Sequence, residues 1–285
     1  MVSFLIDPFS LSFMQRGLVG GILIGMTCAV LGAFVVWRGM AFIGDAMAHT
    51  VLPGIVIAFL NGASLFVGAL IAGIVTAVGI GWFSKDGQVR EDSAIGIMFS
   101  GLFALGIALL SRVNSYQDLS HILFGNVLGV SWGDIAAITV VLIIVGAGVA
   151  LFYKELVVTS FDPGHARAIG LSPATVRYGL LILLALAVVS GIQAVGVVMV
   201  VSLLVTPAAT ASLLTKRLDQ VIVLGAGLSV LGTVTGLLAS FHLDIATGPV
   251  IVLTLTGFFI LTFLFAPKQG WLMRLMDGDL PRRAN

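Results

Sequence analysis

The chain has 285 residues, of which 59% are hydrophobic and only 9% are charged, and its formal net charge is +1. Soluble domains carry about 25% charged residues, so this chain cannot cover a water-facing surface, and we predict an integral membrane protein. The near-neutral charge excludes the basic footprint of a nucleic-acid-binding protein, and the single cysteine excludes both an intramolecular disulfide and a site built from several cysteines.

The apolar segments predict an all-α, polytopic bundle of transmembrane helices that forms a single domain over residues 1–285. A helix crosses a bilayer with about 20 mostly apolar residues. This length gives nine candidate spans, and a count of eight or ten is compatible with the shorter ones. The candidates are 15–37, 45–60, 65–83, 93–110, 134–152, 176–190, 195–214, 221–241 and 249–265. Residues 119–129 are too short to span and are interpreted as re-entrant, interfacial or an extension of the next helix.

The charged residues between the spans predict the orientation in the membrane. Basic residues are retained on the cytoplasmic side, so the loops that contain Lys85, Lys154 and Lys216, together with the carboxy terminus, are expected inside. Arg112 is the exception, because it falls on the predicted outer side. Residues 1–14 contain no basic residue, so we expect a retained interfacial segment rather than a cleaved signal peptide.

A carboxylate and an imidazole occur together in the second predicted span. Asp45 and His49 are four residues apart, so on a helix their side chains share one face. Carboxylate oxygen suits manganese, and imidazole nitrogen suits transition metals that include iron and zinc. Two interpretations remain open: a divalent-cation site, or a hydrogen-bonded pair that fixes helix packing. Two ligands also leave a metal incompletely coordinated, so further ligands would have to come from elsewhere.

Three further residues near the predicted outer surface are candidate metal contacts. His121 is either an interfacial histidine or a ligand on the route into the protein. His242 and Asp244 are either part of a solvated loop or an outer gate that contacts cations weakly.

The connection at residues 160–173 predicts a short cytoplasmic helix. Asp162 can cap a helix whose first residue is Pro163, and Gly170 suits its carboxy-terminal end. Such a helix either docks into a separate motor protein or lies on the membrane surface. The sequence contains no G-x-x-x-x-G-K-[ST] loop, His-Glu-x-x-His pair or nucleophile elbow, so we predict a protein that is not an enzyme.

Several ordered motifs resemble the ABC-3 family, the permease subunits of ABC importers for manganese, zinc and iron. The resemblance covers the chain except for residues 277–285. Its motifs are Pro-Phe at 8–9, Phe-Met-Gln-Arg at 13–16, Arg-Gly-Met-Ala-Phe-Ile-Gly-Asp-Ala at 38–46 followed by His49, Leu-Pro-Gly at 52–54, Leu-Phe-Gly-Asn at 123–126, Phe-Asp-Pro at 161–163, Ala-Arg-Ala at 166–168 and Pro-Ala-Ala-Thr-Ala at 207–211.

The resemblance implies partner proteins and functional roles for several of these residues. Two copies of such a permease pair with two cytoplasmic ATPases in a bacterial inner membrane and receive metal from an extracytoplasmic binding protein. Asp45 and His49 would then line the metal path, without a permanently bound cofactor. The helix that contains Asp162, Pro163, Arg167 and Gly170 would couple the permease to the ATPase. Asn126 with His121 favours manganese over zinc.

Other functions are compatible with the same residues. A permease for iron chelates or cobalamin would carry a bulky cargo that needs no acid–imidazole pair. A proton-driven secondary transporter would use Asp45 and His49 as a proton relay and would need no partner proteins. A structural membrane protein would show no metal dependence. A protonated imidazole cannot bind a metal, so if His49 is a ligand, uptake should fall in acid.

Overall fold

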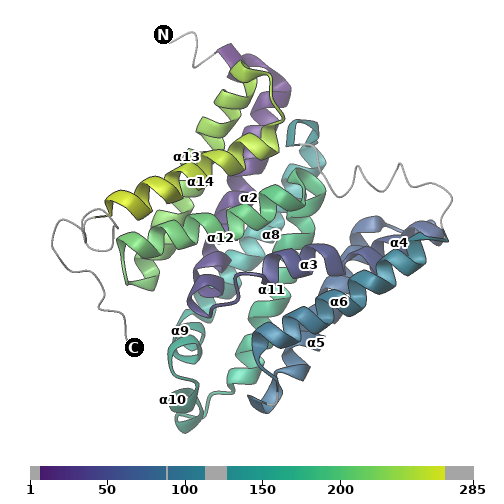
Figure 1. The fold of residues 1–285 in the computed structure, drawn as a ribbon, viewed down its shortest axis with the longest axis vertical. Helices are drawn as coiled ribbons and strands as arrows, with labels where there is room; N and C mark the ends of the chain where they lie inside the picture. The colour runs from purple at the N-terminus through teal and green to yellow at the C-terminus, as the bar shows by residue number, and fades with distance from the viewer. Residues whose placement is uncertain (1–6, 88, 113–126, 267–285) are drawn as a thin grey trace, which may run out of the picture.

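The computed structural model describes residues 7–87, 89–112 and 127–266, and within these ranges it contains helices and no strand (Figure 1). Nine helical segments of the described residues are long and apolar enough to cross a membrane, which confirms the predicted all-α bundle. They are α2 (Ser12–Trp37), α3 with α4 (Ile43–Thr50 and Leu52–Leu60), α5 (Leu65–Phe83), α6 (Glu91–Leu110), α8 (Trp132–Leu151), α11 (Pro173–Val195), α12 (Val197–Leu214), α13 (Leu218–Leu243) and α14 (Thr247–Phe265).

The remaining elements are short. They are the 3₁₀ helices η1 (Asp7–Ser10), η2 (Lys85–Gly87) and η3 (Val127–Gly129), and the helices α9 (Tyr153–Phe161) and α10 (Pro163–Ala168). Most of the segment predicted at 119–129 lies outside the described residues, and only its last turn, η3, is seen. The amino-terminal end of α2 and the α9–α10 pair lie at opposite ends of the molecule (Figure 1).

Glycines allow the central helix α2 to pack closely against α12 and α13. A Cβ on Gly32 would collide with the backbone carbonyl oxygen of Leu204 in α12. On the same helix, Gly25 lies against Ser229 of α13. Small residues at helix interfaces permit this close approach in membranes, where the burial of apolar area gives little driving force.

The helix α3 lies in the interior of the bundle, between the α4–α5–α6 group and the α12–α14 group (Figure 1). Its buried residues include Gly44, which packs against Leu204 of α12. The second span is interrupted at Val51. Pro53, at the start of α4, has no N–H to donate to the carbonyl of His49, and this missing bond favours the interruption.

Within residues 160–173 the structure contains the short helix α10, which begins at Pro163 as its capping pattern predicted. The Oδ1 atom of Asp162 accepts a hydrogen bond of 2.8 Å from the backbone N–H of His165. The helix ends in a Schellman motif, because the N–H of Gly170 donates to the Arg167 carbonyl and that of Leu171 donates to the Ala166 carbonyl. Gly170 has a φ of +83°, a backbone conformation that favours glycine.

Candidate metal-ion site

Asp45 and His49 lie side by side on α3. The Nε2 atom of His49 is 3.5 Å from Oδ1 of Asp45, and the side chains are 32% and 49% exposed, respectively. Their neighbours Ala46, Met47 and Ala48 are buried. The 3.5 Å separation exceeds the usual N–H···O distance of about 2.7–3.2 Å, so the pair is not closed by a strong hydrogen bond. Both polar groups therefore remain accessible to a cation.

Two aromatic rings of α6 position the imidazole. The ring of His49 contacts Phe99 and Phe103 edge-on, with centroid distances of 5.8 and 5.2 Å. The two phenylalanine rings are stacked on each other at 5.7 Å. This packing restricts the orientation of the imidazole.

A second acidic side chain joins the site from a different helix. Asp45 lines a pocket of about 270 Å³, whose wall also contains Asp92 of α6 and Phe99. Asp92 stands in the first turn of α6 and is exposed. The fourth candidate span begins at residue 93, so the sequence places Asp92 in the preceding loop, and the contact between α3 and α6 has no local sequence signal. The pocket therefore holds two carboxylates beside the imidazole-bearing face of α3.

The site is incomplete in the part of the chain that the structure describes. Among the described residues, no group of three or more His, Cys, Asp or Glu side chains could hold a metal ion. A closed metal site usually takes four or more ligands. The arrangement of Asp45 and His49 therefore suits transient contact with a passing cation, or a site completed by another chain.

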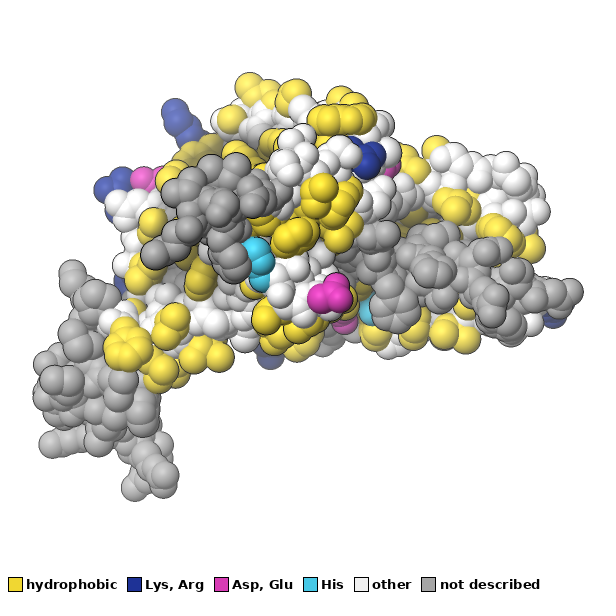
Figure 2. All heavy atoms as spheres, turned by 90° about the horizontal axis from the view of Figure 1, so that it is seen from above, with side chains coloured by type: hydrophobic (Ala, Val, Ile, Leu, Met, Phe, Trp, Pro, Cys, Tyr) yellow, Lys and Arg dark blue, Asp and Glu magenta, His cyan; other side chains and the backbone are white. Residues whose placement is uncertain are grey.

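Two of the other predicted metal contacts, His242 and Asp244, are not brought to this pocket. The third, His121, lies outside the described residues. His242 and Asp244 lie at the carboxy-terminal end of α13, where Asp244 lines a separate cavity of about 730 Å³. The ring of His242 contacts Phe241 at 5.4 Å. Seen from this end of the molecule, hydrophobic and uncharged groups cover most of the described surface (Figure 2).

Polar contacts at the opposite end connect α9, which leads into α10, to the end of α2. Arg38, just after α2, donates hydrogen bonds to the hydroxyl groups of Ser160 and Thr159 in α9, at 2.9 and 3.1 Å. Trp37 packs edge-on against Phe161 with a centroid distance of 4.7 Å. Because α10 follows α9 directly, these contacts join the predicted coupling segment to the central helix. Sequence reasoning missed these contacts, since the partners are more than 100 positions apart.

A second polar contact at this end ties α11 to α5 and α6. Arg177 of α11 is 3.2 Å from the carboxylate of Glu91 in α6, and it donates hydrogen bonds to the carbonyls of Gly81 and Ser84. The Arg177 side chain is only 14% exposed. Pairing of this kind is expected for a largely buried charge.

Comparison with known proteins decides the family. Residues 10–266 match the ABC 3 transport family. The chain belongs to the ABC 3 transport family. This match confirms the family resemblance found in its motifs. This ABC 3 protein is therefore a multi-pass membrane component of a transport system.

Relatives of this ABC 3 protein match along most of their length. It is 46% identical over 261 residues to the manganese transport system membrane protein MntC of Listeria monocytogenes, which covers 92% of this chain and 93% of the relative. It is 42% identical over 271 residues to the chelated iron transport system membrane protein YfeD of Yersinia pestis, with 93% and 89% covered. A chain of the solved structure of PsaBC from Streptococcus pneumoniae in complex with Fab superposes with a TM-score of 0.83 at 37% identity, covering 95% of this chain and 99% of that chain.

Proposed function

We propose that this ABC 3 protein is the permease subunit of an ATP-driven importer of divalent metal ions, with manganese favoured and zinc or iron as alternatives. The observation that carries the proposal is the accessible carboxylate–imidazole pair, with the two groups 3.5 Å apart on α3. Carboxylate oxygen suits Mn²⁺, and imidazole suits several transition metals. The names of the manganese-transporting relatives support the same cargo.

The proposed importer contains partners that this chain lacks. A second copy of the chain would supply further ligands to Asp45 and His49, whose exposure leaves them accessible to it. Separate cytoplasmic ATPase chains would supply energy, and an extracytoplasmic binding protein would deliver the metal. The whole assembly would reside in a bacterial inner membrane, with the basic α9–α10 end and the carboxy terminus cytoplasmic.

Transport of metal into proteoliposomes tests this function. The permease would be reconstituted with its ATPase, with binding protein outside, and supplied with Mn²⁺ in the presence of competing Zn²⁺, Fe²⁺ or a bulky iron chelate. We expect ATP-dependent Mn²⁺ uptake that free divalent ions inhibit and the chelate does not. Preferential uptake of the chelate would instead support the alternative that the chelated-iron relative suggests. Uptake without ATP or an ATPase would indicate a proton-coupled secondary transporter.

Asp92 is proposed as a second carboxylate on the metal path. It lines the same pocket as Asp45 but, unlike His49, lies on α6. The variant Asp92→Asn keeps the shape and removes one negative charge, so we expect the KM for Mn²⁺ to rise about three- to tenfold, as for loss of one screened charge contact. The uptake assay at limiting Mn²⁺ measures this, with Asp219→Asn on α13 as the control. An unchanged KM would remove Asp92 from the path.

The contacts of Arg38 are proposed to transmit the movement of α10 to α2. The variant Arg38→Gln removes the guanidinium that binds Ser160 and Thr159. Since charge-assisted hydrogen bonds are about twice as strong as neutral ones, we expect metal uptake per ATP hydrolysed to fall several-fold while ATP hydrolysis persists. Parallel assays of hydrolysis and uptake measure the ratio. An equal loss of both rates would indicate failed assembly rather than failed coupling.

A further inference from the structure

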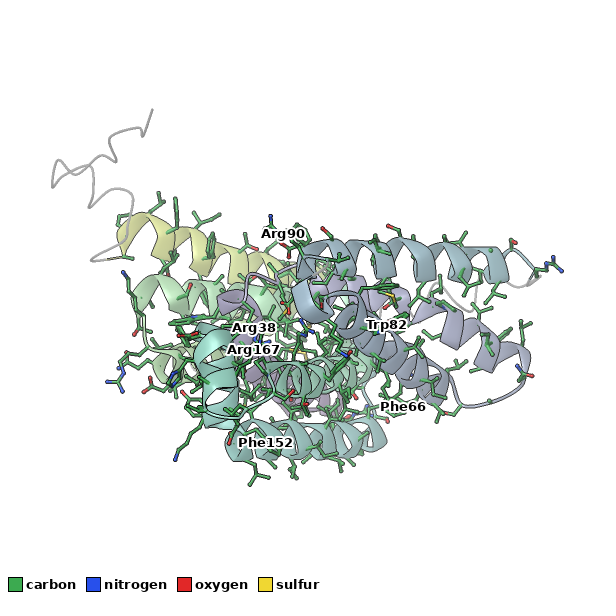
Figure 3. The ribbon with its side chains drawn as sticks, turned by 90° about the horizontal axis from the view of Figure 1, so that it is seen from below. Arg38, Phe66, Trp82, Arg90, Phe152 and Arg167 are labelled. Atoms are coloured by element: carbon green, nitrogen blue, oxygen red, sulfur yellow. The ribbon has the colours of Figure 1, made fainter. Side chains whose placement is uncertain are left out.

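A basic cavity lies at the α10 end of the molecule, apart from the pocket of Asp45. It has a volume of about 610 Å³ and is enclosed by the ends of several helices and by the connection between α5 and α6. Its charged lining residues are Arg38, Lys85, Arg90, Glu91, Arg167 and Arg177. Figure 3, seen from this end, labels Arg38, Arg90 and Arg167 on the elements that surround it.

The positive charge of this cavity is poorly compensated. Among the described lining residues the one carboxylate, Glu91, is paired with Arg177. No ion pair joins any of the other four cations to an acidic side chain of the described residues. The Nε–H of Arg177 is buried without a hydrogen-bond partner. Burial lowers the pKa of Arg38, Glu91 opposes this shift, and Arg177 adds to it. An anion in the cavity would relieve this imbalance.

The amino termini of two helices add to the positive electrostatic potential of this cavity. Arg90 and Glu91 stand at the amino terminus of α6, and Ser172, Pro173 and Ala174 stand at that of α11. The amino terminus of a helix carries a partial positive charge and unpaired N–H groups, which favour phosphate and other anions. Two such termini meet at a cavity that is lined by guanidinium and ammonium groups. Glu91 and Asp92 offset part of the positive charge at α6, and at α11 the Ser172 hydroxyl accepts from the N–H of Thr175.

The surrounding surface places the cavity at the edge of the membrane. Trp82, next to the carbonyl of Gly81 that Arg177 binds, is 67% exposed. Exposed tryptophan rings are enriched at the interface between lipid and water. Basic pockets at the cytoplasmic ends of transmembrane helices recognise phospholipid headgroups.

We propose that this cavity binds a phosphate group from the cytoplasmic side, carried by an anionic phospholipid or by soluble phosphate. Arg167 of α10 and Arg90, which directly precedes α6, would contact the same anion, so the bound phosphate would link the coupling segment to the helix that carries Asp92. The site does not depend on the identity of the transported metal.

Binding measurements on the purified permease–ATPase complex test the proposal. The double variant Lys85→Gln with Arg90→Gln removes two exposed cations of the cavity. The matched control, Lys154→Gln with Lys216→Gln, removes the same charge at exposed positions outside it. Native mass spectrometry would measure retained phosphatidylglycerol against phosphatidylcholine, and equilibrium dialysis of delipidated complex would measure inorganic phosphate. We expect at least about tenfold weaker binding in the cavity variant only, since each basic residue contributes to anion attraction.

The two arms separate the sources of the phosphate. Selective loss of phosphatidylglycerol supports a lipid site, and selective loss of inorganic phosphate supports a soluble anion. Equal binding by wild type, cavity variant and control would overturn the proposal. Loss of the ATPase from the cavity variant, with anion binding unchanged, would also overturn it and would identify the cavity as a protein-docking surface.

Discussion

Replacement of either Asp45 by Asn or His49 by Ala is expected to abolish metal uptake while the transporter still assembles. Each variant removes one of the two ligands that α3 offers to the cation. Loss of residues that merely support metal ligands lowers affinity about 10–100-fold, so loss of a ligand should lower uptake by at least about a hundredfold. ATP-dependent uptake of Mn²⁺ by proteoliposomes measures this effect.

Because both side chains are partly exposed, their replacement is expected to change transport without changing folding. Asp45 and His49 are 49% and 32% exposed, and substitutions at such positions usually change stability little. His49 also packs on Phe99 and Phe103, so His49→Gln provides a second variant that retains more volume. Asp219→Asn, on the exposed end of α13, is the carboxylate control. Normal uptake by both site variants, in complexes that contain the ATPase, would eliminate the site assignment.

Replacement of Gly32 by Ala is expected to destabilise the helix bundle. The added Cβ would collide with the carbonyl oxygen of Leu204. A backbone atom cannot move away by changing rotamer, so α2 and α12 would have to separate. Overpacking in a dense interior destabilises a protein by about 1–3 kcal/mol. Because the collision is with the backbone, we expect the destabilisation by Gly32→Ala to lie at the upper end of this range. The thermal unfolding midpoint of the detergent-purified permease measures the loss.

Gly146→Ala is the matched control for Gly32→Ala. Gly146 also lies inside a transmembrane helix, α8, but a Cβ there meets no atom of the described structure within 4 Å. Alanine is a better helix former than glycine by about 1 kcal/mol, so this control should be neutral or slightly stabilising. Equal unfolding midpoints for the two variants would show that the α2–α12 approach is not a source of stability.

The sequence predicted the spans well but located some helix ends poorly. The third candidate, 65–83, agrees with α5 (Leu65–Phe83), because apolar composition alone marks such a helix. Residues 191–194 were predicted as a connection, yet α11 continues to Val195. Gly191 lies within that helix against Val200 of α12, so the glycine serves close packing rather than a turn. The helix ends at Gly196, whose φ is +89°.

Contacts of the candidate site could be predicted only between residues that are close together in the sequence. The proximity of Asp45 and His49 followed from a four-residue spacing, and the structure confirms it. The position of Asp92 beside Asp45 depends on how α6 packs against α3, which no local pattern encodes. The same limit applies to Arg38, whose partners in α9 are more than 100 positions away in the sequence. Local spacing therefore identified the Asp45–His49 pair but not Asp92, which lines the same pocket as Asp45.

Pulsed electron paramagnetic resonance of Mn²⁺ bound to the purified permease–ATPase complex tests the metal site most directly. Nuclear spins of coordinated nitrogen couple to the Mn²⁺ electrons, so the spectrum reports whether an imidazole is a ligand. We predict a nitrogen coupling in the wild type that disappears in the His49→Gln variant, together with loss of bound Mn²⁺ in the Asp45→Asn variant. Bound Mn²⁺ with the same spectrum in all three proteins would contradict a cation site on α3.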